Sequence, residues 1–241
     1  MLTFDNVRFQ YAVEDFSIID HLSFEVQNGE FVSIIGASGC GKSTIFRLVN
    51  KLLTPASGVI RVDGESIETK KNYCGYMPQQ DLLFPWRTVR ENLMLPMEIQ
   101  GGYSKEQMQK KADDALQSVG LADWGDKTQK ELSGGMRQRA AFARTVLTGS
   151  DLLLLDEPFS ALDYLTRLSM REWLLEQWEK EKKTVLFITH DVEEAVFLSS
   201  RILVVEQSPI THLRSIEVPA GYPRSREELR RPEILSLKEE L

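Results

Sequence analysis

The sequence predicts an α/β protein with a parallel-sheet core, an antiparallel β-rich start and an inserted α-helical segment. Alternating apolar residues open the chain, and short β-branched apolar runs such as 31–35 and 184–188 are followed by helical patterns. Between residues 93 and 119 the composition changes to Gln, Lys, Glu, Met and Ala. Strands that alternate with helices are typical of parallel sheets, because the chain must cross over between parallel neighbours.

Length and composition exclude several classes of protein. The 241 residues fit one domain of moderate size, and 42% hydrophobic residues can bury a core, which excludes a disordered chain. The uncharged stretch Phe31–Gly41 is far shorter than the roughly 20 apolar residues of a spanning helix. The first residues have neither the basic nor the apolar region of a secretory signal, so we expect a cytosolic protein. A net charge of −7 argues against nucleic acid as a partner.

The elements of the first 60 residues follow from their patterns. Leu2–Phe9 and Ile18–Val26 alternate apolar and polar residues and predict antiparallel strands. Phe31–Ile35 is a continuous apolar run that ends in glycine and predicts a strand buried on both faces. A helix is expected from Lys42, because apolar residues recur there at helical spacing until Pro55 and Gly58.

The second half of the chain alternates strands and helices. We expect strands at 152–155 and 184–188, helices at about 165–181 and from 193, a further strand at 213–218 and a charged C-terminal helix. The predicted organisation is a single domain in three parts. These parts are a core with the β-subdomain (1–92 with 150–218), a helical subdomain (about 93–149) and a C-terminal tail (219–241).

A glycine-rich loop of the type that binds nucleotide phosphates lies between the first buried strand and the helix after it. Its residues fit the pattern G-x-x-x-x-G-K-[ST] and are Gly36, Ala37, Ser38, Gly39, Cys40, Gly41, Lys42, Ser43 and Thr44. Backbone N–H groups and the positive end of the helix dipole suit an anion there. We expect Lys42 to neutralise β- and γ-phosphate charge, Ser43 to ligate Mg²⁺ and Thr44 to bind a phosphate oxygen. A simple glycine-rich turn is the alternative.

Two adjacent carboxylates, Asp156 and Glu157, follow the apolar strand 152–155. The strand could simply end in solvent at this point. Beside a phosphate loop, however, Asp156 is the expected carboxylate on the Mg²⁺ side, and Glu157 is the expected base that polarises the attacking water.

The segment Leu132–Arg139 resembles the signature segment of one family, the ATP-binding cassette (ABC) ATPases. The resemblance implies the ABC ATPase fold, with a phosphate-loop core, and a head-to-tail dimer that sandwiches ATP between two subunits. In such a dimer Ser133, Gly134 and Gly135 meet the γ-phosphate of the ATP that the partner binds. The alternative is an ordinary Ser-Gly-Gly helix cap.

Other family elements occur in the family's order. Tyr11 is similar to the aromatic residue that stacks on adenine, with Phe9 and Phe16 as rivals. Gln79 resembles the glutamine that contacts Mg²⁺ and the reactive water. Gln80 is a competitor for this role, and Pro78 departs from the commoner Phe.

The last two family elements lie beyond the acidic pair. Ser160–Asp163 resembles the segment that crosses the dimer interface, and His190 resembles the switch histidine on the γ-phosphate. The resemblance thus makes Lys42, Gln79, Glu157 and His190 the catalytic set, assigns ATP contacts to Asp163, and adds Gln79 to Ser43 and Asp156 as Mg²⁺ ligands.

The stretches Leu83–Val89 and Pro158–Asp163 are similar to the importer branch that serves nitrate, sulfonate and taurine, and to thiamine-precursor pyrimidine importers. This resemblance implies a peripheral subunit at the cytoplasmic face of the cell membrane, working as a homodimer or paired cassette. Its partners would be integral membrane permease subunits and, indirectly, an extracytoplasmic solute-binding protein. We expect the permease to dock near Gln79 on Leu83, Phe84, Pro85 and Trp86; alternatively, Trp86 fills the core of its subdomain.

Two other functions fit parts of the sequence. A soluble, non-transport ABC-type ATPase would usually carry a coiled-coil insertion or a second cassette, and the chain has neither. An ATP-binding regulatory module without turnover would not need Glu157 and His190.

Overall fold

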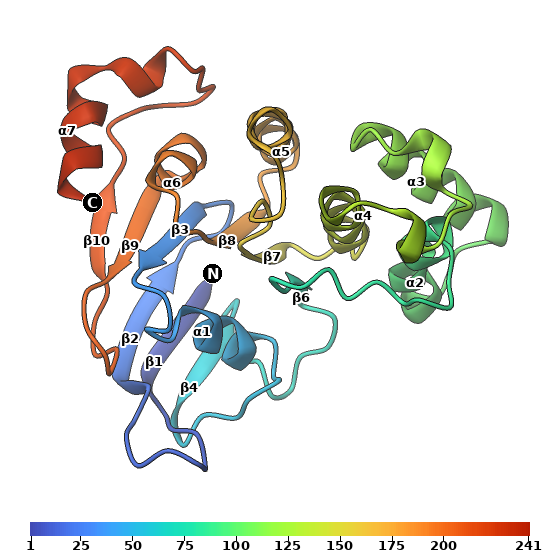
Figure 1. Ribbon diagram of the computed structural model, residues 1–241. Helices are drawn as coiled ribbons and strands as arrows, with labels where there is room; N and C mark the ends of the chain where they lie inside the picture. The colour runs from blue at the N-terminus through green and yellow to red at the C-terminus, as the bar shows by residue number, and fades with distance from the viewer. The chain divides into compact units, whose positions relative to one another are not determined.

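The computed structural model describes all residues from Met1 to Leu241. The chain forms two compact units (Figure 1). The first, called the core unit below, comprises Met1–Tyr73 and Leu174–Leu241, and the second, called the helical unit, comprises Cys74–Trp173. The helical unit is larger than the helical subdomain expected from the sequence (about 93–149), because it also contains two strands and the loop that follows the first of them.

An antiparallel sheet opens the core unit, as predicted. Its strands are β1 (Leu2–Phe9), β2 (Ile19–Val26), β4 (Ser57–Val62) and β5 (Glu65–Ser66), in the order β2-β1-β4-β5. The alternating residues Leu2, Phe4, Val7 and Phe9 are all buried. The period of two therefore gives the sheet one apolar face.

The parallel part of the core unit is built around β3 (Phe31–Gly36). This strand pairs in parallel with β8 (Thr184–Ile188) and with β9 (Arg201–Val205), and β10 (Arg214–Glu217) pairs antiparallel with β9. All five residues of β8 are buried, as are the first five of β3. Burial on both faces explains why these strands are continuous apolar runs.

The C-terminal tail packs on the core unit. Ile234 and Leu237 of α7 (Pro232–Glu240) share an apolar cluster with Val196 of α6 (Val192–Leu198). Buried Arg224 donates hydrogen bonds to the carbonyls of Val196 and Ser199 at 2.7 and 2.6 Å. The guanidinium thus satisfies carbonyls at the end of α6 that no helical N–H reaches.

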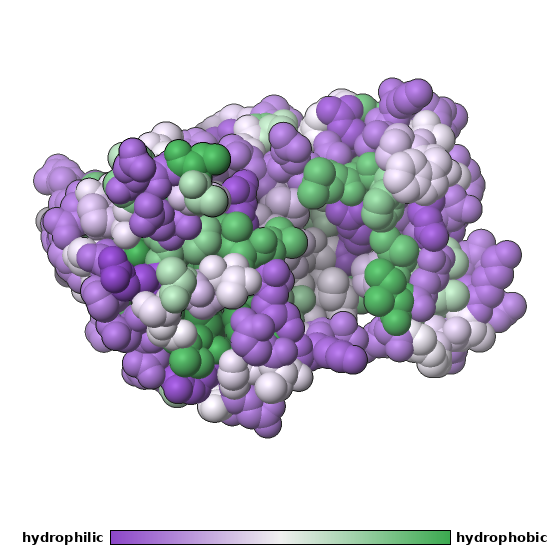
Figure 2. All heavy atoms as spheres, turned by 90° about the horizontal axis from the view of Figure 1, so that it is seen from below, coloured by the Kyte–Doolittle hydropathy of each residue, from purple (hydrophilic) through white to green (hydrophobic).

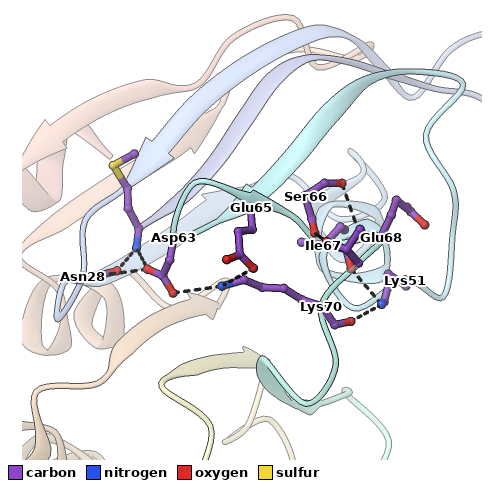
Figure 3. A network of polar contacts seen from close by, with 10 residues as sticks. Asn28, Lys51, Asp63, Glu65, Ser66, Ile67, Glu68 and Lys70 are labelled. Carbon is purple, nitrogen blue, oxygen red and sulfur yellow. Dashed lines mark hydrogen bonds and ion pairs between the residues drawn. The ribbon is translucent and has the colours of Figure 1, made fainter.

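Lysine side chains fix the segment after β4 (Figure 3). Lys51, which follows α1 (Lys42–Val49), donates to the carbonyls of Ile67 and Lys70 at 2.9 and 2.8 Å. The Lys70 ammonium lies 3.5 Å from the Asp63 carboxylate. These contacts hold the chain close to α1 just before it leaves the core unit.

The helical unit contains two parallel strands, β6 (Cys74–Met77) and β7 (Leu152–Asp156). Its α-helices are α2 (Val89–Gln100), α3 (Lys105–Ser118), α4 (Gly134–Val146) and the first part of α5 (Tyr164–Glu181); short 3₁₀ turns lie at Ala122–Trp124 and Gln129–Glu131. Thr88, Ser104 and Ser133 cap α2, α3 and α4 through their hydroxyl groups. The core unit contains one 3₁₀ turn as well, at Glu228–Arg230, immediately before α7. No helix of the chain combines the length and apolar character needed to span a membrane.

Candidate functional site

The glycine-rich loop connects β3 to α1 in the core unit, as the sequence predicts. Gly41 caps α1 with φ of 105°, and a Cβ there would lie 2.6 Å from Ile18 Cγ2. Only glycine fits, because a side chain would be both strained and overlapping. The first turn of α1 therefore begins with backbone close to Ile18.

Lys42 lies buried within this loop. Its ammonium donates to the carbonyls of Gly36 and Ala37 at 2.8 Å each, and lies 3.9 Å from Cys40 Sγ. The side chain of Lys42 thus reaches from the C-terminal end of the loop back to its first two residues. An ammonium inside a ring of backbone is placed to meet an anion that the loop binds.

Tyr11 contacts the helix that follows the loop. Its hydroxyl lies 3.2 Å from the Thr44 hydroxyl, and its ring meets Phe9 edge-on with centroids 4.8 Å apart. Phe9 is buried at 6% exposure, whereas Phe16 is 58% exposed. The structure therefore places Tyr11 beside the predicted phosphate site with its ring half-buried, and Phe9 behind it.

His190 is exposed in the short bend between β8 and α6. The Thr189 hydroxyl donates to buried Glu194 at 2.6 Å and accepts from the Asp191 N–H at 3.0 Å. Asp191 caps α6 by accepting from the Glu193 N–H at 2.8 Å. Both neighbours of His190 are thus fixed by hydrogen bonds, which holds the histidine backbone.

The acidic pair lies at the end of β7 in the helical unit. Asp156 is buried, and Glu157 turns out of the strand with φ of 48° immediately before Pro158. The Gln79 amide donates to the Glu157 carboxylate, Nε2 to Oε2, at 3.1 Å. The structure therefore brings Gln79 and Glu157 together, while Asp156 stays inside.

A left-handed φ is unusual for a glutamate and costs about 1–2 kcal/mol. Residues before proline also prefer extended backbone, so the neighbouring Pro158 does not favour this conformation. Such strain persists only where surrounding contacts hold it.

The segment Ser133–Gly135 forms the start of α4. The Ser133 hydroxyl accepts from the Met136 N–H at 3.3 Å, and a Cβ at Gly135 would lie 3.2 Å from Leu162. The helix cap is thus real, and the helix start packs closely on the segment after Glu157. Asp163 accepts from the Thr166 hydroxyl and N–H, which lowers the pKa of the Asp163 carboxyl.

A pocket of about 410 Å³ opens in the helical unit. Its lining residues are Gln79, Gln80, Asp81, Leu82, Leu83, Gln129, Gly134, Arg137, Gln138 and Ala161. The pocket therefore lies between the loop after β6 and the start of α4.

The loop beside this pocket presents an aromatic pair. Trp86 is 75% exposed, and its ring lies 5.0 Å from that of Phe84. The alternative that Trp86 fills the core is therefore wrong; Leu83 is the buried residue of this loop. Buried Asn92 fixes the loop by accepting from the Phe84 N–H at 2.7 Å and donating to the Thr88 carbonyl at 2.9 Å. Figure 2 shows apolar residues gathered among hydrophilic ones on one face of the molecule.

Two arginines of α4 were missed by the sequence analysis. Arg137 donates to the Asp81 carboxylate at 3.0 Å, and Arg144 donates to the backbone carbonyls of Asp81 and Leu82 at 3.0 and 2.9 Å. Burial lowers the pKa of the Arg144 guanidinium. The two residues are seven positions apart and so share a helix face, which was the available signal.

Oxygen donors dominate the residues predicted to hold Mg²⁺. The chain contains no cluster of three or more His, Cys, Asp or Glu side chains suited to a metal. Ser43, Gln79 and Asp156 supply a hydroxyl, an amide oxygen and one carboxylate. Mg²⁺ prefers such hard donors and is commonly held by one or two carboxylates together with substrate phosphates. The type of donor therefore suits Mg²⁺; Ser43 belongs to the core unit, and Gln79 and Asp156 belong to the helical unit.

Known proteins resemble the chain along nearly all of its length. Residues 19–160 match the family model described as ABC transporter. The chain is 45% identical over 227 residues to the formylaminopyrimidine import ATP-binding protein ThiZ of Halalkalibacterium halodurans, covering 94% of this chain and 88% of that protein. It is 40% identical over 209 residues to the aliphatic sulfonates import ATP-binding protein SsuB of Bacillus cereus, covering 87% and 82%. A dimeric post-hydrolysis ATP-binding cassette, MJ0796, bound to ADP and Pi, matches with a TM-score of 0.83 and 28% identity over 92% of this chain and 100% of that chain.

Proposed function

The chain belongs to the ABC transporter family, and from that premise we propose that it is the ATP-hydrolysing subunit of an importer of small solutes. It binds ATP and is an ATPase, like the import ATP-binding proteins that it resembles. The observation that carries the proposal is Glu157, placed after buried Asp156 with the Gln79 amide on its carboxylate.

The core unit supplies the nucleotide-binding residues. The amides from Gly36 to Thr44 bind the phosphates, and Lys42 exchanges its carbonyl partners for β- and γ-phosphate oxygens. Tyr11 stacks on adenine, a role supported by its contact with Thr44. His190 bonds the γ-phosphate from its fixed turn.

The hydrolytic residues act on the attacking water. Glu157 accepts its proton, and Gln79 orients the carboxylate that does so. Ser43, Gln79 and Asp156 would hold Mg²⁺, which would supply positive charge to offset that of the phosphates.

Two copies, or this chain and a paired cassette, form the working dimer. Ser133, Gly134 and Gly135 meet the ATP bound by the partner, and Asp163 lies near the same interface. The helix N-terminus at Ser133 suits the γ-phosphate, and the related cassette of known structure is dimeric. ATP closes this dimer, and hydrolysis reopens it, which drives the permease.

ATP-dependent dimerisation tests this arrangement. In Glu157→Gln, which retains ATP, we expect Mg-ATP to convert monomer into dimer, measured by light scattering after size exclusion. Adding Ser133→Ala is expected to raise the dissociation constant of the dimer roughly tenfold or more for each nucleotide site, because a charge-assisted hydrogen bond to the partner's ATP is lost there.

Ser104→Ala is the matched control, since it removes the hydroxyl cap of α3 in the same unit. Ser104→Ala should leave the dissociation constant of the dimer unchanged. Equal dimerisation of the Ser133 and Ser104 variants would contradict the proposed role of Ser133.

Permease subunits dock on the loop 83–86 through exposed Pro85 and Trp86 and half-buried Phe84, which buried Leu83 anchors from below. The subunit works as a peripheral protein at the cytoplasmic face of the cell membrane. Exposed Trp86, packed against half-buried Phe84 in a loop that Asn92 holds by hydrogen bonds, supports this role, because aromatic side chains are enriched in interfaces. An extracytoplasmic solute-binding protein acts with the permease. The solute is nitrate-, sulfonate- or taurine-like, or pyrimidine-like; the relatives named for formylaminopyrimidine and aliphatic sulfonates support these classes.

A further inference from the structure

Gln138 lies on α4, far in sequence from the acidic pair, yet its side chain is buried against the turn after β7. Its Nε2 donates to the Glu157 carbonyl and to the Ser160 hydroxyl, at 3.2 Å each. Its Oε1 accepts from the Ala161 N–H at 2.9 Å. One amide therefore binds the turn at three points.

The orientation of this amide follows from its partners. The Ala161 N–H can only donate and the Glu157 carbonyl can only accept, so a flipped amide would oppose like groups at both ends. The Ser160 hydroxyl in turn donates to the Glu157 carbonyl at 3.0 Å. Gln138 and Ser160 thus converge on the carbonyl of the residue with φ of 48°.

We propose that Gln138 is a positioning residue, which holds the strained turn at Glu157 so that its carboxylate faces Gln79 and the attacking water. The inference rests on the proposed role of Glu157 as the base. Gln138 lies on the helix whose first residues, Ser133–Gly135, meet the partner's ATP. It therefore links the start of α4 to the hydrolytic carboxylate of its own subunit.

A double-mutant cycle tests this link. Gln138→Met keeps the length of the side chain but removes all three hydrogen bonds, so the carboxylate is free to shift. We expect kcat for ATP hydrolysis to fall roughly tenfold or more, because small misplacements of catalytic groups have large effects. The affinity for a fluorescent ATP analogue is expected to stay within about twofold, since the phosphate loop is untouched.

The single-turnover rate is measured for all four proteins of the cycle. In a Glu157→Gln background, Gln138→Met is expected to have no further effect on this rate, because the group that Gln138 positions is already inactive. An equal fold-loss in both backgrounds would show that Gln138 acts independently of Glu157 and overturn the inference. A normal kcat for Gln138→Met, together with a large loss of kcat in Glu157→Gln, would overturn the role inferred for Gln138 but leave the proposed role of Glu157 intact. Normal hydrolysis by Glu157→Gln would instead reject the proposed base.

The matched control is Gln117→Met, the same change at an exposed position of α3. It should match the parent in every assay. Thermal unfolding of each variant shows whether it is folded at the assay temperature. If Gln138→Met does not fold, Gln138→Asn serves in the same cycle, because it keeps the amide but is too short to reach the turn.

Discussion

Glu157→Gln is expected to reduce steady-state phosphate release at saturating Mg-ATP by about 10²–10⁴-fold, the contribution typical of a general base. Glutamine has nearly the same size and can adopt the same turn, but it cannot accept the proton of the attacking water. Nucleotide binding is expected to be retained, because the phosphate loop lies in the core unit. Measuring kcat and the affinity for ATP separately distinguishes these effects.

Glu239→Gln is the control, since it makes the same change at an exposed position of α7. Its kcat should equal that of the parent. A Glu157→Gln rate within about threefold of the parent would contradict the assignment of the base, because proton transfer would then not depend on this carboxylate.

Lys42→Ala is expected to abolish productive ATP binding. Loss of the hydrogen bonds between the ammonium and phosphate oxygens removes about 1.5–3 kcal/mol for each bond, or roughly ten- to hundredfold in affinity. Hydrolysis falls further, since the same charge stabilises the transition state. Equilibrium binding of ATP and phosphate release measure the two effects.

Lys51→Ala provides a closely matched control. Lys51, like Lys42, donates to two backbone carbonyls in the core unit, but these belong to Ile67 and Lys70 (Figure 3). Its loss should reproduce the structural effect of removing a lysine without affecting phosphate binding. Normal ATP binding by Lys42→Ala, or an equal defect in Lys51→Ala, would reject the proposed function of the loop.

Local sequence patterns predicted much of the fold. The apolar run of β3, the following glycines and the helix from Lys42 lie where the spacing placed them, because all three depend on neighbouring residues. The antiparallel start followed equally from its period of two. The charged C-terminal helix was also predicted, although the tail's attachment through Arg224 was not.

The features that sequence did not predict depend on contacts between distant residues. Gln138 and Glu157 are brought together only when α4 packs beside the end of β7, and no local pattern indicates that contact. The left-handed backbone of Glu157 is likewise imposed by its surroundings against residue preference. Whether Trp86 is buried or exposed could be decided only from its packing.

The central claim is that this ATPase serves a membrane permease, and its most direct test is the identity of the trapped complex. We would express the Glu157→Gln variant in its native host cell, add Mg-ATP and solubilise the membranes in detergent. The variant is then purified, and the proteins that co-purify with it are identified. A variant that also carries Trp86→Ala is the control for the docking loop. The account predicts a multi-spanning membrane protein with Glu157→Gln and much less of it with the added Trp86→Ala; recovery of soluble partners alone would contradict the account and favour the non-transport ATPase.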